Sequence, residues 1–219
     1  MLLRSNGTVW GLAAVLSLIS FHCSVTQPVR VIEKGSTQLS ASFGGPLIHP
    51  AGFPMPVPYL TAGVVHGLTD DVTFYGRTHV TMLLFGDLGL DAGAASALLH
   101  QRGYAPEVTI AGEMYFFSDL RHGRVTRAYP YLSLNASYDV GTSTIVFAGA
   151  DDMYQFRPAH HFLTPFAGVE FPVSNRFAFQ VEWKWMAANV NTAHGVFEGY
   201  SSLGDYGAFG TFLGMTYRW

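Results

Sequence analysis

The last fifteen residues of the chain, DYGAFGTFLGMTYRW from Asp205 to Trp219, change character at every second position. One face of this stretch carries Phe209, Thr211, Leu213, Met215, Tyr217 and Trp219. The other face carries Ala208, Gly210, Phe212, Gly214, Thr216 and Arg218. Successive side chains of a β-strand point to opposite faces of its sheet, so the alternation predicts a strand that runs to the final residue.

A strand that ends on an aromatic residue is unusual, because chain ends tend to fray in water. A barrel inside a membrane needs such a strand, since unpaired backbone groups would otherwise face hydrocarbon. The ending resembles the C-terminal assembly signal of bacterial outer-membrane β-barrel proteins, and the matching residues are Leu213, Met215, Tyr217 and Trp219. The resemblance implies a Gram-negative outer-membrane location, contact with outer-membrane lipid, and folding by the barrel assembly machinery.

The composition of the chain also favours a membrane barrel. Of the 219 residues, 49% are hydrophobic, 24 are glycine and only 12% are charged, whereas soluble domains carry about 25% charged residues. No internal stretch reaches the ~18 consecutive apolar residues of a membrane helix. The formal net charge of −3 gives no reason to expect a nucleic-acid partner. A soluble secreted β-sandwich is the alternative fold.

The N-terminal segment has the features of an export signal, with Arg4 followed by a short apolar core. Cys23, the only cysteine, comes just after that core and resembles the acylated cysteine of a bacterial lipoprotein. Two outcomes stay open: Cys23 carries a lipid, or the signal is cut near Thr26 and Cys23 is lost. The predicted division is a signal peptide at 1–22, a periplasmic linker at 23–35 and a barrel at 36–219.

Alternating patterns predict an all-β fold, an antiparallel transmembrane β-barrel of about ten strands. The predicted strands before the C-terminal one are 36–44, 58–66, 72–83, 88–98, 107–117, 128–138, 144–150, 162–171 and 176–187. The clearest has Phe177, Phe179, Val181, Trp183 and Trp185 on its apolar face. Residues 91–101 also suit a helix, because they are rich in Ala and Leu. An eight-strand barrel follows if 88–98 is not a strand or if 144–150 merges with a loop.

The lengths of the connections support the same architecture. Turns and loops should alternate between short on the periplasmic side, where both termini are expected, and long on the outer side. The predicted short turns are GLTDD, HQRGYAP, DVGTS and PVSN. The predicted long loops are 45–58, 118–127, 151–161 and 188–204. The turn at 85–87 is the exception, because it is short on the outer side.

The inward faces of the predicted strands gather polar and charged residues. The lumen-facing candidates are Arg77, His79, Asp91, Glu113, Asn135, Glu170, Gln180, Glu182, Lys184 and Arg218. Charges of both signs in a narrow lumen of low dielectric must pair, and small barrels are filled by their own side chains. A structural or passive barrel with a plugged lumen is therefore the main functional hypothesis. A narrow porin-like channel, or a barrel that binds a small solute or a surface ligand, is the alternative.

One predicted outer loop carries Asp151, Asp152, His160 and His161, residue types that serve in hydrolysis and in metal binding. A surface-loop hydrolase is therefore a third hypothesis. No serine or further histidine stands at a diagnostic spacing from these residues. The sequence assigns no catalytic residue, no metal ligand and no cofactor.

Overall fold

The computed structural model describes residues 25–48, 55–121, 126–141, 143–191 and 203–219, and these residues form a closed antiparallel β-barrel of ten strands. The elements are β1 (Thr37–Ile48), β2 (Met55–Pro56), β3 (Tyr59–Gly67), β4 (Val72–His79), α2 (Val80–Leu84), β5 (Asp87–Leu99), β6 (Glu107–Asp119), β7 (Thr126–Val140), β8 (Thr144–Phe156), β9 (Ala159–Pro172), β10 (Phe177–Asn191) and β11 (Tyr206–Arg218). The two-residue β2 only pairs with the end of β1 and is not one of the ten. The fold class predicted from the sequence is confirmed.

The barrel closes where its first strand meets its last. Each other strand pairs with its neighbours in chain order, and β1 pairs with both β3 and β11. The closing ladder runs from Gln38 opposite Arg218 to Pro46 opposite Gly210. The C-terminal alternation predicted this strand correctly, and its pairing leaves no sheet edge along the barrel wall.

The outer wall of the barrel is apolar, as lipid requires. On β10, Phe177, Phe179 and Trp183 project outward, and 53% of Trp183 is exposed. The alternate residues Gln180, Glu182 and Lys184 are buried. Leu132 and Leu134 on β7 are likewise half-exposed, while Ser133 between them is buried. Charged residues inside and apolar residues outside reverse the arrangement of a soluble protein, which excludes the β-sandwich alternative.

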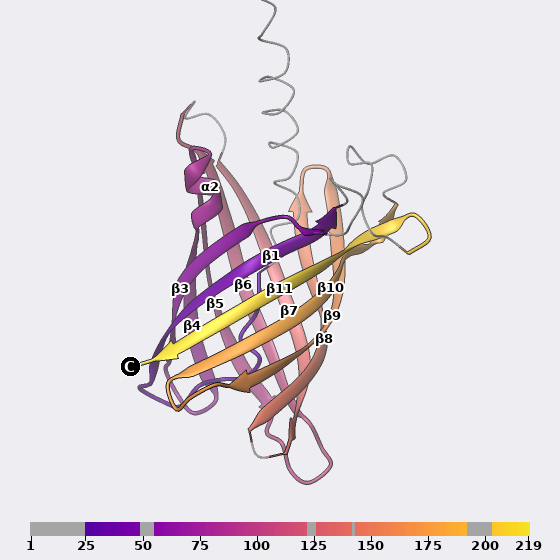
Figure 1. The fold of residues 1–219 in the computed structure, drawn as a ribbon. Helices are drawn as coiled ribbons and strands as arrows, with labels where there is room; N and C mark the ends of the chain where they lie inside the picture. The colour runs from indigo at the N-terminus through magenta and orange to yellow at the C-terminus, as the bar shows by residue number, and fades with distance from the viewer. Residues whose placement is uncertain (1–24, 49–54, 122–125, 142, 192–202) are drawn as a thin grey trace, which may run out of the picture.

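The two ends of the barrel differ. At the turn end, short connections follow Gly67, Leu99, Val140 and Pro172, and the C-terminus lies there (Figure 1). At the opposite end, which we name the loop end, stands α2. This helix explains the apparent exception at 85–87, because the whole connection from β4 to β5 spans residues 80–86. Among the described residues, no helix is long and apolar enough to span a membrane.

Three sequence-based boundaries are wrong. The strand predicted at 72–83 ends at His79, where α2 begins. The loop predicted at 151–161 is instead the continuation of β8 and β9, which reverse at Arg157 and Pro158. The strand predicted at 144–150 therefore extends to Phe156. The loop was predicted from its polar residues. Polar residues also occur on the inner face of a membrane barrel, so they do not distinguish a loop from a strand. Residues 91–101 form a strand up to Leu99 rather than a helix.

Aromatic rings cover cross-strand glycines on the inner wall. Phe147 on β8 pairs with Gly168 on β9, and Gly149 pairs with Phe166. A Cβ atom built on Gly168 would overlap the ring of Phe147 and the carbonyl oxygen of Val181. A Cβ atom on Gly149 would likewise overlap the ring of Phe166. The missing side chains let these rings lie flat against the wall and fix the local register.

Replacement of Leu134 by Arg should lower the free energy of unfolding by about 2–4 kcal/mol, because Leu134 projects outward halfway along β7. Urea unfolding in lipid vesicles measures this change. The control is Tyr104→Arg, since Tyr104 lies in the 100–106 turn and is 99% exposed; it should change stability by less than about 1 kcal/mol. Equal effects of the two substitutions would contradict the assigned lipid-facing surface.

Gly168→Ala should destabilise the barrel by about 1–3 kcal/mol, because the new methyl group displaces Phe147 or the backbone of β10. The same unfolding assay measures it. Gly112→Ala is the matched control, since a Cβ atom there meets nothing within 4 Å. A neutral Gly168→Ala would show that the ring does not rest on the glycine.

Candidate functional site in the barrel lumen

The chain before β1 lies inside the barrel rather than beside it. We expected residues 23–35 to form a periplasmic linker, but residues 25–33, named here the internal segment, run through the lumen. Val25 is fully buried among Tyr115, Tyr131 and neighbouring rings in the loop-end half. Further along, the backbone amide of Ile32 donates to Thr73 Oγ1 near the turn end. Residues 25–33 of the predicted linker therefore lie inside the barrel.

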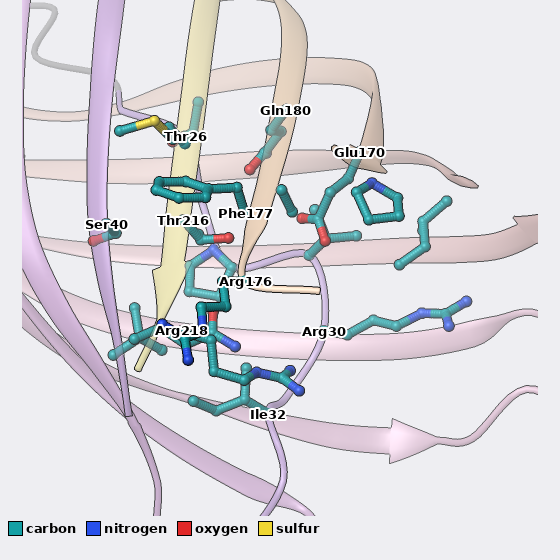
Figure 2. A pocket seen from close by; sticks show the side chains of 18 of the residues that line it. Thr26, Arg30, Ile32, Ser40, Glu170, Arg176, Phe177, Gln180, Thr216 and Arg218 are labelled. Atoms are coloured by element: carbon teal, nitrogen blue, oxygen red, sulfur yellow. The ribbon is translucent and has the colours of Figure 1, made fainter. Parts of the chain in front are cut away.

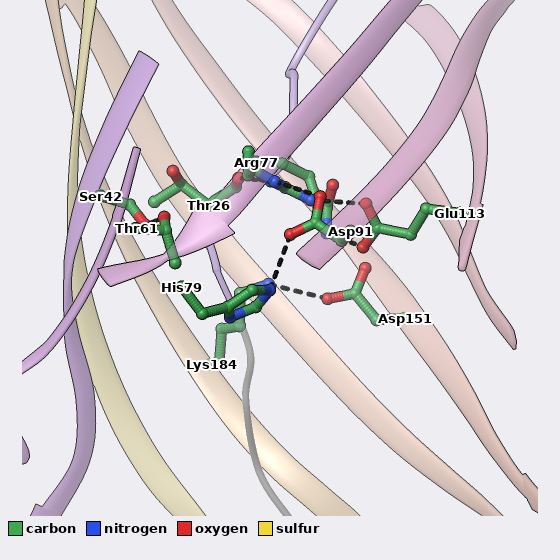
Figure 3. Close-up of polar contacts among 10 residues, drawn as sticks. Thr26, Ser42, Thr61, Arg77, His79, Asp91, Glu113, Asp151 and Lys184 are labelled. Carbon is green, nitrogen blue, oxygen red and sulfur yellow. Dashed lines mark hydrogen bonds and ion pairs between the residues drawn. The ribbon is translucent and has the colours of Figure 1, made fainter. Parts of the chain in front are cut away.

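Arg77 on β4 is the centre of one buried charge cluster (Figure 3). Its Nε lies 2.8 Å from Asp91 Oδ1, and another of its guanidinium nitrogens pairs with Glu113. It also donates to the carbonyl oxygen of Thr26 at 2.7 Å, and Gln27 Nε2 donates to Glu113 at 2.9 Å. These last two bonds attach the internal segment to the barrel wall.

The cluster extends toward the loop end through His79. His79 Nε2 lies 2.9 Å from the second oxygen of Asp91, and its Nδ1 is hydrogen-bonded to the hydroxyl of Tyr59. Both His79 and Asp91 have fully buried side chains. Tyr59, His79, Asp91 and Arg77 thus form one continuous polar chain across β3, β4 and β5.

Lys184 on β10 is the centre of a second cluster. Its Nζ lies 2.8 Å from both Asp151 Oδ2 and Glu182 Oε1, and all three side chains are fully buried. Gln180 connects the clusters, because its Nε2 donates to Glu182 at 2.9 Å and to the carbonyl oxygen of Gln27 at 3.4 Å. The barrel wall and the internal segment therefore share one polar network.

Each cation of this network faces two carboxylates. Arg77 lies between Asp91 and Glu113, and Lys184 lies between Asp151 and Glu182. Removal of either cation would leave like charges together in a medium of low dielectric, which is strongly destabilising. The arrangement therefore serves to fix the shape of the lumen.

The structure places the ten predicted lumen residues in two groups. Arg77, His79, Asp91, Glu113, Asn135, Gln180, Glu182 and Lys184 are buried inside the barrel. Glu170 and Arg218 lie nearer the turn end, where they line a cavity. The C-terminal residues Leu213 and Met215 face outward. Cys23 and the predicted signal peptide lie outside the described residues.

Sequence reasoning missed four residues of the network. Asp151 was assigned to a loop, and Thr26, Gln27 and Arg30 were assigned to the linker. In the structure Val25, Gln27 and Val29 alternate with less buried residues, but the polar Gln27 between two valines hides this alternation in the sequence. Arg30 Nη1 lies 2.9 Å from Asp139, and Arg30 Nε donates to Ser137 at 2.8 Å. Only the fold brings these distant residues together.

The proposed hydrolytic or metal-binding set does not assemble. Asp152 and His161 pair at 2.8 Å on the outer wall, whereas Asp151 points into the lumen and binds Lys184. His160 packs its ring on Phe162. Within the described ranges, no group of three or more His, Cys, Asp or Glu residues could hold a metal ion.

A cavity of about 710 Å³ lies in the lumen at the turn end (Figure 2). The internal segment forms one wall, and residues of β1, β3, β4, β8, β9, β10 and β11 contribute the others. On β10 the lining ends at Gln180, and beyond it Glu182 and Lys184 are fully buried. The cavity is therefore a blind pocket.

A closed barrel with an apolar outer wall and a charge-paired interior is a transmembrane β-barrel of the outer-membrane type. Solved structures of similar architecture include the translocator domain of autotransporter NalP from Neisseria meningitidis. It is 11% identical in sequence, the match covers 97% of this chain and 96% of that one, and the TM-score is 0.45.

Ail, the attachment invasion locus protein of Yersinia pestis, is also similar. It is 11% identical over 85% of this chain and 99% of that one, with a TM-score of 0.29. Its complex with the heparin analogue sucrose octasulfate has the same identity and coverage, with a TM-score of 0.30. No protein-family model and no curated protein matches the sequence. Structural similarity this low does not indicate that this chain shares an activity with NalP or Ail.

Lys184→Met should lower the free energy of unfolding by about 3–5 kcal/mol, because Asp151 and Glu182 are left buried without their cation. Urea unfolding in vesicles measures the loss. The triple variant Lys184→Met, Asp151→Asn, Glu182→Gln removes all three charges and should recover at least half of it. A single variant as stable as the original protein would show that the cluster is not charged.

Proposed function

We propose that the protein is an integral outer-membrane β-barrel of Gram-negative bacteria with a structural or passive role, its lumen closed by its own internal segment. The observation that carries this proposal is the attachment of residues 25–33 to the inner wall. Gln27 binds Glu113, and Arg30 binds Ser137, Asp139 and Gln101. A chain held at several points along the lumen prevents solutes from crossing.

The loop-end half of the lumen is filled as well. The buried ring cluster of Tyr115, Phe117, Tyr129 and Tyr131 surrounds Val25. The Tyr115 and Tyr131 rings meet edge to face, with centroids 5.3 Å apart. Such packing resembles a protein core rather than a water-filled pore. These contacts favour a plugged barrel over a narrow channel.

The proposed orientation follows from the two ends of the barrel. In outer-membrane barrels the short turns face the periplasm and the longer loops face outward. The turn end, with the C-terminus, would then be periplasmic. The barrel assembly machinery would recognise the Leu213, Met215, Tyr217 and Trp219 pattern there.

Planar-bilayer recording tests the plug. The unmodified protein should show no steady single-channel steps. Gln27→Ala combined with Arg30→Ala should produce openings, because the segment loses its bonds to Glu113, Ser137, Asp139 and Gln101. Lys34→Ala is the control, since Lys34 is exposed just after the segment.

Two outcomes of the recording distinguish a plugged barrel from a channel. Openings confined to the double variant support a closed barrel whose segment is the plug. Steady steps in the unmodified protein would contradict the proposal and favour the channel alternative.

A further inference from the structure

The blind pocket at the turn end has an uneven distribution of charge. Its charged lining residues are Arg30, Glu33, Arg77, Glu170, Arg176 and Arg218. Arg77 is already paired with Asp91 and Glu113. Arg30 is paired with Asp139 at 2.9 Å and with Glu107 at 3.5 Å. Both of these guanidinium groups are therefore occupied by the barrel's own carboxylates.

Four charged groups of the pocket are left over, and three of them, Glu33, Arg176 and Arg218, are exposed. Within the described part of the chain, no ion pair forms at Glu170, Arg176 or Arg218. Glu170 is partly buried, and Arg30, the cation that acts on it electrostatically, is already paired with two other carboxylates. A carboxylate in a polar but enclosed wall is stabilised by a cation that comes to it. Glu33 is exposed at the mouth.

The leftover charges lie at different depths. Glu170 is opposite Gln180 in the β9–β10 ladder, and both line the pocket. Arg176 and Arg218 lie at the rim, where the amide of Arg218 donates to the carbonyl oxygen of Arg176 at 2.9 Å. From Arg176 to Gln180 the chain advances four residues, about 13 Å along a strand. Figure 2 shows Glu170 and Gln180 toward one end of the pocket and Arg218 toward the other.

We propose that this pocket binds a small zwitterion, with its ammonium group on Glu170 and its anionic group on Arg176 and Arg218. A volume of about 710 Å³ lies within the range of small-molecule sites, roughly 300–1,000 Å³. An extended tripeptide spans about 10 Å, which matches the separation once the arginine side chains reach inward. Gln38, Ser40 and Thr216 supply further hydrogen-bonding groups between the charged ends.

Two kinds of molecule on the periplasmic side carry both an ammonium group and an anionic group. One is a short peptide, whose charged ends match this separation. The other is the phosphoethanolamine headgroup of a phospholipid, whose charges are four bonds apart and which reaches both ends only when the arginine side chains extend fully into the pocket. Trialanine and glycerophosphoethanolamine are soluble probes for the two. Titration calorimetry on the full chain in a non-ionic maltoside detergent avoids a zwitterionic background. Saturable binding of either probe is expected, and the tighter one identifies the source.

Chemical blocking of the probe tests the charge assignment. N-acetyl-trialanine lacks the ammonium group, and trialanine amide lacks the carboxylate; each should bind about tenfold more weakly than trialanine. In the Glu170→Gln variant, trialanine and its N-acetyl form should bind equally. In the Arg176→Gln, Arg218→Gln double variant, trialanine and its amide should bind equally.

Matched controls are available at the other end of the barrel. Asp152→Asn and Arg121→Gln lie outside the pocket lining and should leave binding unchanged. The proposal is overturned if neither probe binds saturably to the folded protein. It is also overturned if the pocket variants and the controls bind both probes alike, or if N-acetyl-trialanine binds as well as trialanine. Conductance plays no part in this test, so the plug and the pocket can fail separately.

Discussion

The ladder between β1 and β11 is the interaction on which the rest of the structure depends. In hydrocarbon every backbone amide and carbonyl must find a partner within the protein, so a sheet is stable there only when its two edges join. The ladder from Gln38 opposite Arg218 to Pro46 opposite Gly210 joins them. Closure then divides the side chains of every strand into two sets, one facing lipid and one facing the lumen.

The contents of the lumen follow from that division. Side chains that face inward cannot reach lipid, and in a small barrel they fill much of the interior. Charges there must find each other, as Arg77 and Lys184 do with two carboxylates each. The internal segment fills part of the remaining space and bonds to the same network through Gln27 and Arg30. The pocket at the turn end lies beside this segment.

The alternation of the strands was enough to predict the fold and most of the lumen from the sequence. A period of two at Phe177–Lys184 or Leu132–Asn135 assigns each residue to a face without knowledge of its neighbours. The failures have different physical causes. Asp151 was assigned to a loop because polar residues usually indicate water, but in a membrane barrel they also indicate the lumen. The short helix after His79 gave no comparable signal.

The partners of the lumen residues could not be predicted, because they depend on strand register and on a segment with no strand neighbours. Gln27 and Glu113 are 86 residues apart, and Arg30 and Asp139 are 109 residues apart. Nothing local in the sequence joins such pairs. The internal position of residues 25–33 is the largest difference from expectation. This segment was predicted as a linker, but it bonds to the buried polar network and lines the pocket.

Amide hydrogen exchange of the protein in lipid bilayers tests barrel closure most directly. The amides of β1 and β11 that face each other should exchange as slowly as those between β6 and β7, which lie in the middle of the sheet. Rapid exchange along both facing edges, with β6 and β7 still protected, would mean an open sheet and would contradict this account of the structure.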